Sequence, residues 1–413
     1  MRKQKNSILD ILIDKIIFLY IISLYIFSFK EDLNLISNFL AGILILLINL
    51  EILIVGRKIY INNFLIIYFI FTVFAMVSSI YAIDSSTALQ KAITLFLIFI
   101  LIFSLANYIY KKNNIKKMLD YFSFAGVISS IYILFSSDLS NIKRYGEELG
   151  NVNSVGIIIG ISTLILIYNL LFENKNVHIN ILLILLNLTV ILMTGSRKAI
   201  IFITVCTFLM IFINSKYDIF KKIKTTFLLI ITVYFIYNLI YINETLYKII
   251  GVRLENLIEF LNGNGTSEGS INVRSDMIKY GFNWFLENPI IGYGIDNYRF
   301  LYSRQLGTFP TYSHNNYIEL MVGLGSIGTI LFYSSHIIVL FSLYNNIRKK
   351  KGNVNSYESL FIGIIFSYLI LSTGMVYYYE KHISILLLMG SMLYDLSKKQ
   401  EKNNDEDKKQ INS

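Results

Sequence analysis

Apolar runs of about 17 to 25 residues recur along this chain, separated by short polar breaks. A helix of that length crosses the hydrocarbon layer of a bilayer, where every backbone polar group must be hydrogen-bonded within the protein. The chain is 55% hydrophobic and has only two prolines among its 413 residues. We therefore expect an all-α polytopic membrane protein rather than a soluble domain.

The apolar runs predict twelve membrane spans. They are expected at residues 11–29, 33–55, 61–83, 92–110, 118–137, 153–171, 178–194, 198–214, 225–243, 315–344, 357–379 and 383–396. The chain then divides into spans one to nine in 1–243, a long loop in 244–314 and three further spans in 315–396. Residues 397–413 mix both charges with few apolar side chains, so we expect a disordered tail there.

Basic residues predict the orientation of these spans. Most of the 37 Lys and Arg fall near the termini and in alternate short loops, as in the clusters 111–117, 221–224 and 348–351. Because short basic loops stay in the cytoplasm, we expect both termini there and the long loop outside. Anionic lipid headgroups then account for the net charge of +10, which makes the bilayer an expected partner. Nucleic acid is not expected, because no basic segment is interleaved with aromatics on a soluble face.

The long loop, residues 244–314, is expected to be functional, because loops of this length seldom lack a role. Within it, YKIIGVRLENLIEFL at 247–261 has apolar residues at helical spacing and predicts an amphipathic helix at the membrane interface. The Gly- and Ser-rich segment 262–270 predicts a hinge. A second amphipathic helix through Met277 is expected to end at Asn288, before a tight turn in PIIGYG.

Three basic groups are the strongest functional candidates. Arg197 follows a Thr-Gly-Ser turn between two apolar runs, where a charge near hydrocarbon is costly; the alternative is a snorkelling interfacial anchor. Arg274 starts the second loop helix and could clamp a phosphate with two parallel hydrogen bonds, although a solvated surface arginine has the same pattern. His314 lies where the loop meets the tenth span, and its imidazole suits a general base; an ordinary interfacial histidine is the alternative.

Other patterns are expected to be structural. Cys206 is the only cysteine and lies within a span, which excludes internal disulfides and cysteine zinc sites and predicts a small buried residue. The sequence GLGSIG at 323–328 matches a nucleotide-binding pattern, but no strand precedes it, so we expect close helix packing instead. Neither HExxH nor a cluster of acidic residues occurs, and we predict no metal and no other cofactor.

Several of these segments resemble the O-antigen ligase and polymerase family of bacterial envelope glycan assembly. The similar segments are TGSRKAIIFI at 194–203, an arginine spaced from PIIGYG in 274–294, SHNNYIELMVGLGSIG at 313–328 and RYGEELGNVNSVG at 144–156. Each segment alone is loose, whereas their order and spacing together are specific.

The resemblance implies a multispanning GT-C-type glycosyltransferase of the bacterial cytoplasmic membrane, using a glycan on undecaprenyl diphosphate without a metal. It implies diphosphate binding by Arg197 and Arg274, with Arg144 as a further candidate, and it makes His314 the catalytic residue. Contacts to the sugars are expected from residues that follow His314. They are Asn315, Asn316, Tyr317 and Glu319. A flippase and a chain-length regulator are expected partners.

The sequence is compatible with three functions: a polymerase, a ligase and a carrier. A polymerase joins repeat units into O-antigen or capsule, and a ligase moves a finished glycan to lipid A core or another acceptor. The Ile, Asn and Lys richness is typical of AT-rich bacterial genomes and favours a polymerase. A flippase or solute transporter would also have about twelve spans, but such carriers build a midplane site from broken helices or repeats. Neither feature is evident in the sequence.

Overall fold

The computed structural model describes residues 8–28, 31–136, 144–173, 176–214, 217–261, 269–349 and 356–411. Within these ranges the regular structure is entirely helical. The long helices are α1 Ile8–Ile26, α2 Glu31–Val55, α3 Asn63–Ser78, α4 Ser85–Lys112, α5 Ile115–Ser136, α6 Val152–Tyr168, α7 Val177–Thr194, α8 Arg197–Ile213, α9 Ile219–Ile242, α14 Asn316–Lys349, α15 Ser356–Leu371 and α16 Lys381–Ile411. The shorter ones are η1 Glu147–Leu149, η2 Asn169–Glu173, α10 Glu244–Leu246, η3 Tyr247–Gly251, α11 Val252–Leu261, α12 Gly269–Glu287 and α13 Tyr298–Leu306.

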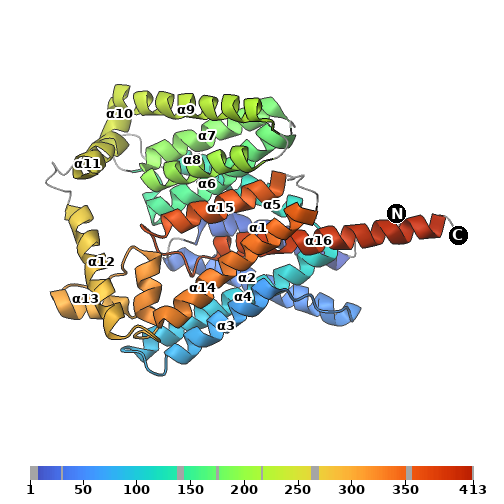
Figure 1. Cartoon of the computed structure of the whole chain (residues 1–413), viewed down its shortest axis with the longest axis horizontal. Helices are drawn as coiled ribbons and strands as arrows, with labels where there is room; N and C mark the ends of the chain where they lie inside the picture. The colour runs from blue at the N-terminus through green and yellow to red at the C-terminus, as the bar shows by residue number, and fades with distance from the viewer. Residues whose placement is uncertain are drawn as a thin grey trace.

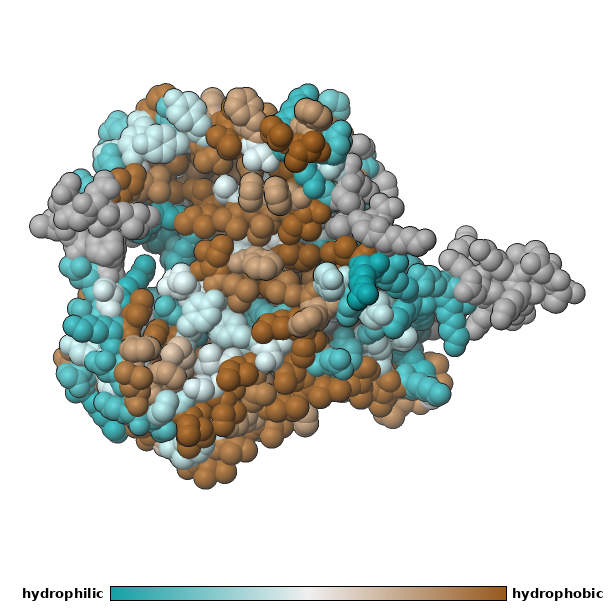
Figure 2. All heavy atoms as spheres, viewed as in Figure 1, coloured by the Kyte–Doolittle hydropathy of each residue, from teal (hydrophilic) through white to brown (hydrophobic). Residues whose placement is uncertain are grey.

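The long helices form one bundle, with α11, α12 and α13 gathered at one end and the last turns of α16 projecting from the other (Figure 1). We call these the loop end and the tail end. Helix α6 packs among α5, α7 and α8, while α14 packs against α3, α12 and α16. Helix α9 lies at the edge, where Ile240 is its only buried residue. Figure 2 shows apolar side chains across the middle of one face and polar ones at both ends, as expected for a protein in a bilayer.

Each predicted span coincides with a long helix, and the protein is a polytopic membrane protein. In the described part of the chain, seven helices are long and apolar enough to cross a membrane. They are Leu33–Val55, Ser85–Lys112, Ile115–Ser136, Val152–Glu173, Val177–Thr194, Ile219–Ile242 and Asn316–Lys349. Two shorter apolar helices, Asn63–Ser78 and Tyr357–Leu371, accompany them. The number of twelve spans stays a prediction.

Helices α3 and α15 are shorter than the predicted spans, and α16 extends into the segment where a disordered tail was predicted. Helices α3 and α15 end at Ser78 and Leu371, because the apolar residues that follow bond to other segments instead. The amide of Ile83 donates to the Tyr293 carbonyl (3.2 Å), and the amide of Tyr377 donates to Asn316 Oδ1 (3.0 Å). Helix α16 runs to Ile411, where a disordered tail was expected. The Lys, Glu and Gln of residues 397–411 are good helix formers, and neither Gly nor Pro occurs among these residues.

The long loop largely follows the expected pattern. Helix η3 and α11 cover the first predicted amphipathic segment, and α12 ends at Glu287, one residue before the expected stop. The predicted hinge lies outside the described residues at 262–268, while Gly269 and Ser270 already belong to α12. Arg274 therefore lies in the second turn of α12 rather than at its start.

The predicted tight turn packs directly on the GLGSIG segment. Gly292 and Gly294 have φ of 70° and 94°, a region that favours glycine. Within α14, Gly325 is also non-helical, with φ 62°, and a Cβ there would lie 2.3 Å from the Ile290 carbonyl oxygen. The Ser326 amide donates to the Pro289 carbonyl (2.8 Å). The glycines thus serve close backbone packing, as predicted.

Candidate functional site

A cavity of about 330 Å³ opens at the loop end of the bundle. Its walls come from α8, α12, the start of α6, the turn before α14 and the loop between α15 and α16. The charged and aromatic residues that line it are Lys198, Arg274, Tyr312, His314, Tyr379 and Glu380. Segments that lie far apart in the sequence, from Ser28 to Glu380, therefore form one polar site.

Arg144 supports one wall of this cavity. Its Nε donates to the Thr194 carbonyl (2.8 Å) and its Nη2 donates to Asn153 Oδ1 (3.3 Å). The Ser196 hydroxyl donates to the same Asn153 oxygen (3.3 Å), which joins the start of α6 to the turn between α7 and α8. Arg144 and Asn153, which belong to one of the family-like segments, are therefore in direct contact. Asn153 lines the cavity, whereas Arg144 lies behind it.

The turn between α7 and α8 places two basic residues on different sides. Gly195 has φ 61°, and a Cβ there would lie 3.0 Å from the Ile249 carbonyl oxygen, so this close approach requires glycine. Ser196 caps α8 by accepting the Ala199 amide. Lys198 lines the cavity and donates to the Gly374 carbonyl, while Arg197 lies outside it and donates to the Arg253 carbonyl of α11.

Arg197 instead lies at a second cavity, of about 270 Å³, between α7, α8 and α9. The other lining residues are mostly aliphatic, among them Leu254 of α11 and Leu229, Ile236 and Ile240 along α9. The expected pair of diphosphate-binding arginines is thus divided between two neighbouring cavities, one polar and one apolar.

Five basic side chains lie close enough at the loop end to affect one another electrostatically. They are Arg144, Arg197, Lys198, Arg253 and Arg274. Burial, followed by the charges of Arg253 and Arg197, lowers the pKa of Arg144 to about 10, against a smaller opposing effect of Glu147. Arg144 still remains charged at neutral pH. Clustered like charges destabilise the free protein, so this arrangement is typical of a site for an anion.

His314 faces this cluster in a constrained conformation. Its φ of 57° lies in the left-handed region, which costs about 1–3 kcal/mol for a residue with a side chain. The flanking residues hold this turn: the Ser313 hydroxyl donates to the Asn315 carbonyl (2.8 Å), and the Tyr312 ring lies 4.3 Å from the imidazole. Burial, with the charges of Arg274 and Lys198, lowers the pKa of His314 to about 4. The imidazole is therefore neutral at pH 7 and able to accept a proton.

The four residues expected to contact sugars bond to α14, to the His314 turn and to the segment around α15. Asn315 caps α14, because its Oδ1 accepts the amides of Tyr317 and Ile318 at 3.0 and 3.1 Å. Asn316 is fully buried and accepts the Tyr377 amide. The Tyr317 hydroxyl donates to the Leu369 carbonyl (2.9 Å). Glu319 Oε2 accepts the Ser313 amide (2.8 Å), so its buried carboxylate fixes the residue before His314.

Glu380 is the carboxyl group that lines the cavity. Burial raises its pKa to about 7, although the charges of Lys91 and Lys381 oppose this rise. The Lys91 ammonium also lies 3.9 Å from the centre of the Tyr379 ring. The cavity therefore has a basic side, formed by Lys198 and Arg274, and a second side that is aromatic and acidic.

Residues 182–333 match the family model described as O-antigen ligase. The chain carries an O-antigen ligase family domain. This match supports assignment of the chain to the O-antigen ligase and polymerase family, whose members are glycosyltransferase-like enzymes. None of the curated proteins compared matches the chain.

The O-antigen ligase family domain includes Arg197, Lys198, Arg274 and His314, but the site extends beyond it on both sides. Asn153 precedes the matched region and Glu380 follows it. The sequence already suggested Asn153 through its segment, whereas Lys198 fitted a snorkelling interfacial anchor and was not expected in the site. Glu380 carried no such signal, because it follows an aromatic run that was predicted to lie within a span. In the described ranges, no group of three or more His, Cys, Asp and Glu is arranged to hold a metal.

Proposed function

We propose that this protein is a glycosyltransferase that polymerises oligosaccharide repeat units carried on undecaprenyl diphosphate. The observation that carries the proposal is the placement of the neutral His314 imidazole beside Arg274 and Lys198 in one cavity. That arrangement combines an acceptor for a proton with positive charge for an anionic leaving group. Surface polysaccharide, such as O-antigen or capsule, would be the product.

The donor's diphosphate would occupy the basic side of the cavity. Arg274 and Lys198 line that side, and Arg144, Arg197 and Arg253 add positive charge around it. The neighbouring apolar cavity between α7, α8 and α9 begins at Arg197 and has the aliphatic lining that an isoprenoid chain requires. Lipid and diphosphate would then lie on opposite sides of the turn between α7 and α8.

Transfer would proceed by attack of an acceptor hydroxyl on the anomeric carbon of the donor. The new bond forms between this oxygen and the anomeric carbon, while the bond from that carbon to the diphosphate oxygen breaks. The diphosphate keeps the bonding electron pair, and the hydroxyl proton passes to the His314 imidazole. Attack opposite the leaving group inverts the anomeric configuration. The basic cluster stabilises the charge that develops on the diphosphate, so we propose a metal-independent reaction.

Donor binding would also prepare His314 for its role. In the free protein, the charges of Arg274 and Lys198 help to hold its pKa at about 4. A bound diphosphate would offset both charges and raise that pKa, because an adjacent negative charge favours the imidazolium. The histidine thus becomes a stronger base when the donor is in place.

We further propose that the fold is GT-C-like and that the loop end faces the outside of the bacterial cytoplasmic membrane, with both termini inside. The basic loops of the sequence support this orientation. A ligase would use the same donor but another acceptor. Purified protein given only lipid-linked repeat units would lengthen them if it is a polymerase, whereas a ligase would require lipid A core or another acceptor.

Two substitutions test the proposal. We expect His314→Ala and Arg274→Ala each to reduce polymer formation from lipid-linked repeat units by about 100-fold or more, because each removes a group that acts in the transition state. His178→Ala and Lys279→Ala are matched controls, since both side chains are exposed away from the cavity. Membrane levels of all four variants would be measured in parallel. Undiminished polymer from both cavity variants would overturn the assignment.

A further inference from the structure

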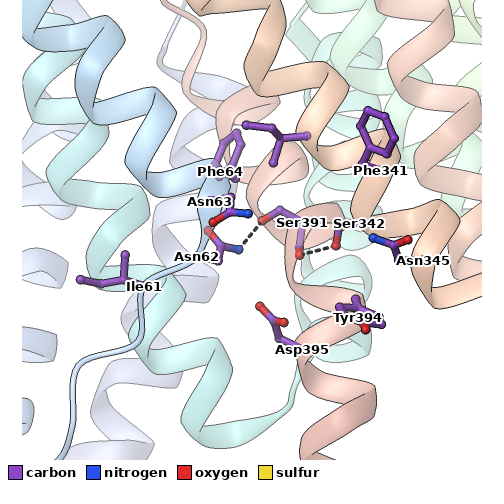
Figure 3. Close-up of a pocket in the computed structure, with 11 residues that line it drawn as sticks. Ile61, Asn62, Asn63, Phe64, Phe341, Ser342, Asn345, Ser391, Tyr394 and Asp395 are labelled. Carbon is purple, nitrogen blue, oxygen red and sulfur yellow. Dashed lines mark hydrogen bonds between the residues drawn. The ribbon is translucent and has the colours of Figure 1, made fainter. Parts of the chain in front are cut away.

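A second polar cavity, of about 480 Å³, lies at the tail end, away from the proposed catalytic site. It is formed by the start of α3, the end of α14 and the middle of α16 (Figure 3). Two hydrogen bonds join these helices behind it: Asn62 Nδ2 donates to the Ser391 hydroxyl (3.0 Å), and the Ser342 hydroxyl donates to the Ser391 carbonyl (2.8 Å). The cavity thus has a fixed wall.

Along α14 and α16, the lining of this cavity changes from apolar to polar toward the tail end. On α14, Ile338 and Phe341 precede Ser342 and Asn345 toward the helix end. On α16, the polar residues Ser391, Tyr394 and Asp395 lie beyond the apolar stretch 385–389. Phe341 is 62% exposed, so the apolar side opens toward the surrounding hydrocarbon. An occupant therefore needs an apolar part on the membrane side and a polar part toward the tail end.

The polar part of the cavity is rich in hydrogen-bonding groups but has no basic lining residue. Asp395 supplies a carboxylate, and its Oδ2 accepts the Tyr60 hydroxyl (2.6 Å). Asn63 and Asn345 add exposed amides. Figure 3 shows the Asp395 carboxylate directed from α16 toward the start of α3. Carboxylates and amides bind hydroxyl groups well, whereas a phosphate would need positive charge.

From these features we propose that the tail-end cavity binds a neutral glycosylated lipid. The sugar hydroxyls would donate to Asp395 and exchange hydrogen bonds with Asn345, while the acyl chains would lie against Phe341 and Ile338. The Tyr394 ring is already covered by the Lys398 ammonium, which lies 4.2 Å from the ring centre. Recognition therefore depends on the carboxylate and the amides rather than on stacking. This site is independent of the proposed transfer reaction.

Binding of defined lipids to the purified full chain tests the proposal by native mass spectrometry. Monoglucosyl diacylglycerol would be compared with phosphatidylglycerol, phosphatidylethanolamine and methyl glucoside. We expect the glucolipid to bind at least about tenfold more tightly than each of the other three, because hydrogen bonds to a charged group are worth that factor. Equal binding of the three lipids would overturn the proposal, and so would equally tight binding of methyl glucoside.

Three variants link any binding to the cavity. Asp395→Asn should weaken glucolipid binding about tenfold while its amide oxygen still accepts the Tyr60 hydroxyl, and Asn345→Ala should weaken it about threefold. Asn283→Ala is the matched control, because this exposed amide lies on α12. Asn345 is exposed, so its variant tests the site even if Asp395→Asn fails to fold. Equal affinities of the Asn345 and Asn283 variants would refute the assignment.

Discussion

The basic residues at the two ends of the bundle have different partners. At the tail end, three part-buried basic groups meet carboxylates: Lys111 Nζ lies 2.6 Å from both Asp10 and Glu51, and Arg57 Nη2 lies 2.6 Å from Glu51. Lys112 lies 2.8 Å from Asp10. These ion pairs tie α1, α2 and α4 together. Their role is structural, because opposite charges at this distance compensate each other's loss of hydration.

At the loop end Arg299 and Lys91 lie 2.8 and 3.6 Å from Asp296, but the basic groups at the cavity meet neutral partners. Arg144 bonds to a carbonyl and an amide, and Lys198 bonds to a carbonyl. In the ranges that the structure describes, neither Lys198 nor Arg274 forms an ion pair with a carboxylate. The basic groups at the loop-end cavity therefore keep a positive potential that a ligand could use, whereas those at the tail end are neutralised by carboxylates within the fold.

The largest expected effect concerns the tail end. Glu51 is only 1% exposed in its side chain and bonds both Arg57 and Lys111. Glu51→Gln should lower the free energy of unfolding by about 3–5 kcal/mol, because it leaves the part-buried Arg57 without its counter-charge and leaves Lys111 with Asp10 alone. Unfolding in detergent would be followed by circular dichroism. Glu401→Gln, which breaks an ion pair with Lys349 at a 61% exposed carboxylate, should cost less than about 1 kcal/mol. Equal losses would contradict the comparison.

Adding a carboxylate at the loop end should not lower the stability of the protein, but it should lower its activity. Arg274→Glu places a negative charge among basic groups, so we expect an unchanged or slightly higher melting temperature together with a loss of transfer activity of about 100- to 1,000-fold. Lys279→Glu, at an exposed position of the same helix, makes the same charge change away from the cavity. A strongly destabilised Arg274→Glu protein would show that this arginine is structural, as at the tail end.

The pH dependence of transfer should reveal the same positive potential. Since His314 has a pKa of about 4 in the free protein, kcat/KM should fall only near that pH. The acid limb of kcat should lie about 1 to 2 pH units higher, because bound diphosphate offsets the charges of Arg274 and Lys198. The lowered pKa also means that the unfolded chain binds more protons between about pH 6.5 and 4, so stability falls as the pH drops through that range. If the acid limbs of kcat and kcat/KM fell at the same pH, this result would argue against anion binding beside His314.

The helices were predictable because their signal is local. Long apolar runs and short polar breaks placed every long helix, and glycines predicted the tight turn at 289–294, but not its contact with α14. The segments 79–83 and 372–379 were predicted as parts of spans, because no charged residue interrupts either of them. Their hydrogen bonds go to segments distant in sequence, and composition does not encode such partners.

The site was predictable in its residue types but not in its geometry. Arg274 and His314 line one cavity, as a shared role requires, while Arg197 lies in a neighbouring cavity. The sugar contacts expected from the residues that follow His314 stay a prediction. After His314, however, the chain enters α14, and Asn315 to Glu319 serve its cap and its packing. Glu380 reaches the cavity only through the folding of the loop between α15 and α16.

The smallest expected effect comes from the edge of the loop-end cluster. Arg253 lowers the pKa of Arg144 through its charge, and its main-chain carbonyl accepts the Arg197 bond. Arg253→Ala keeps that carbonyl, so only the charge is lost. We expect donor affinity to fall about three- to tenfold at low ionic strength, and the difference to shrink at 1 M salt, where the screening length is about 3 Å. Lys248→Ala, an exposed charge paired with Glu244, is the control. A loss of affinity that persists undiminished in 1 M salt would mean that Arg253 contacts the donor directly. Arg253 would then not contribute to the long-range positive potential of the loop end.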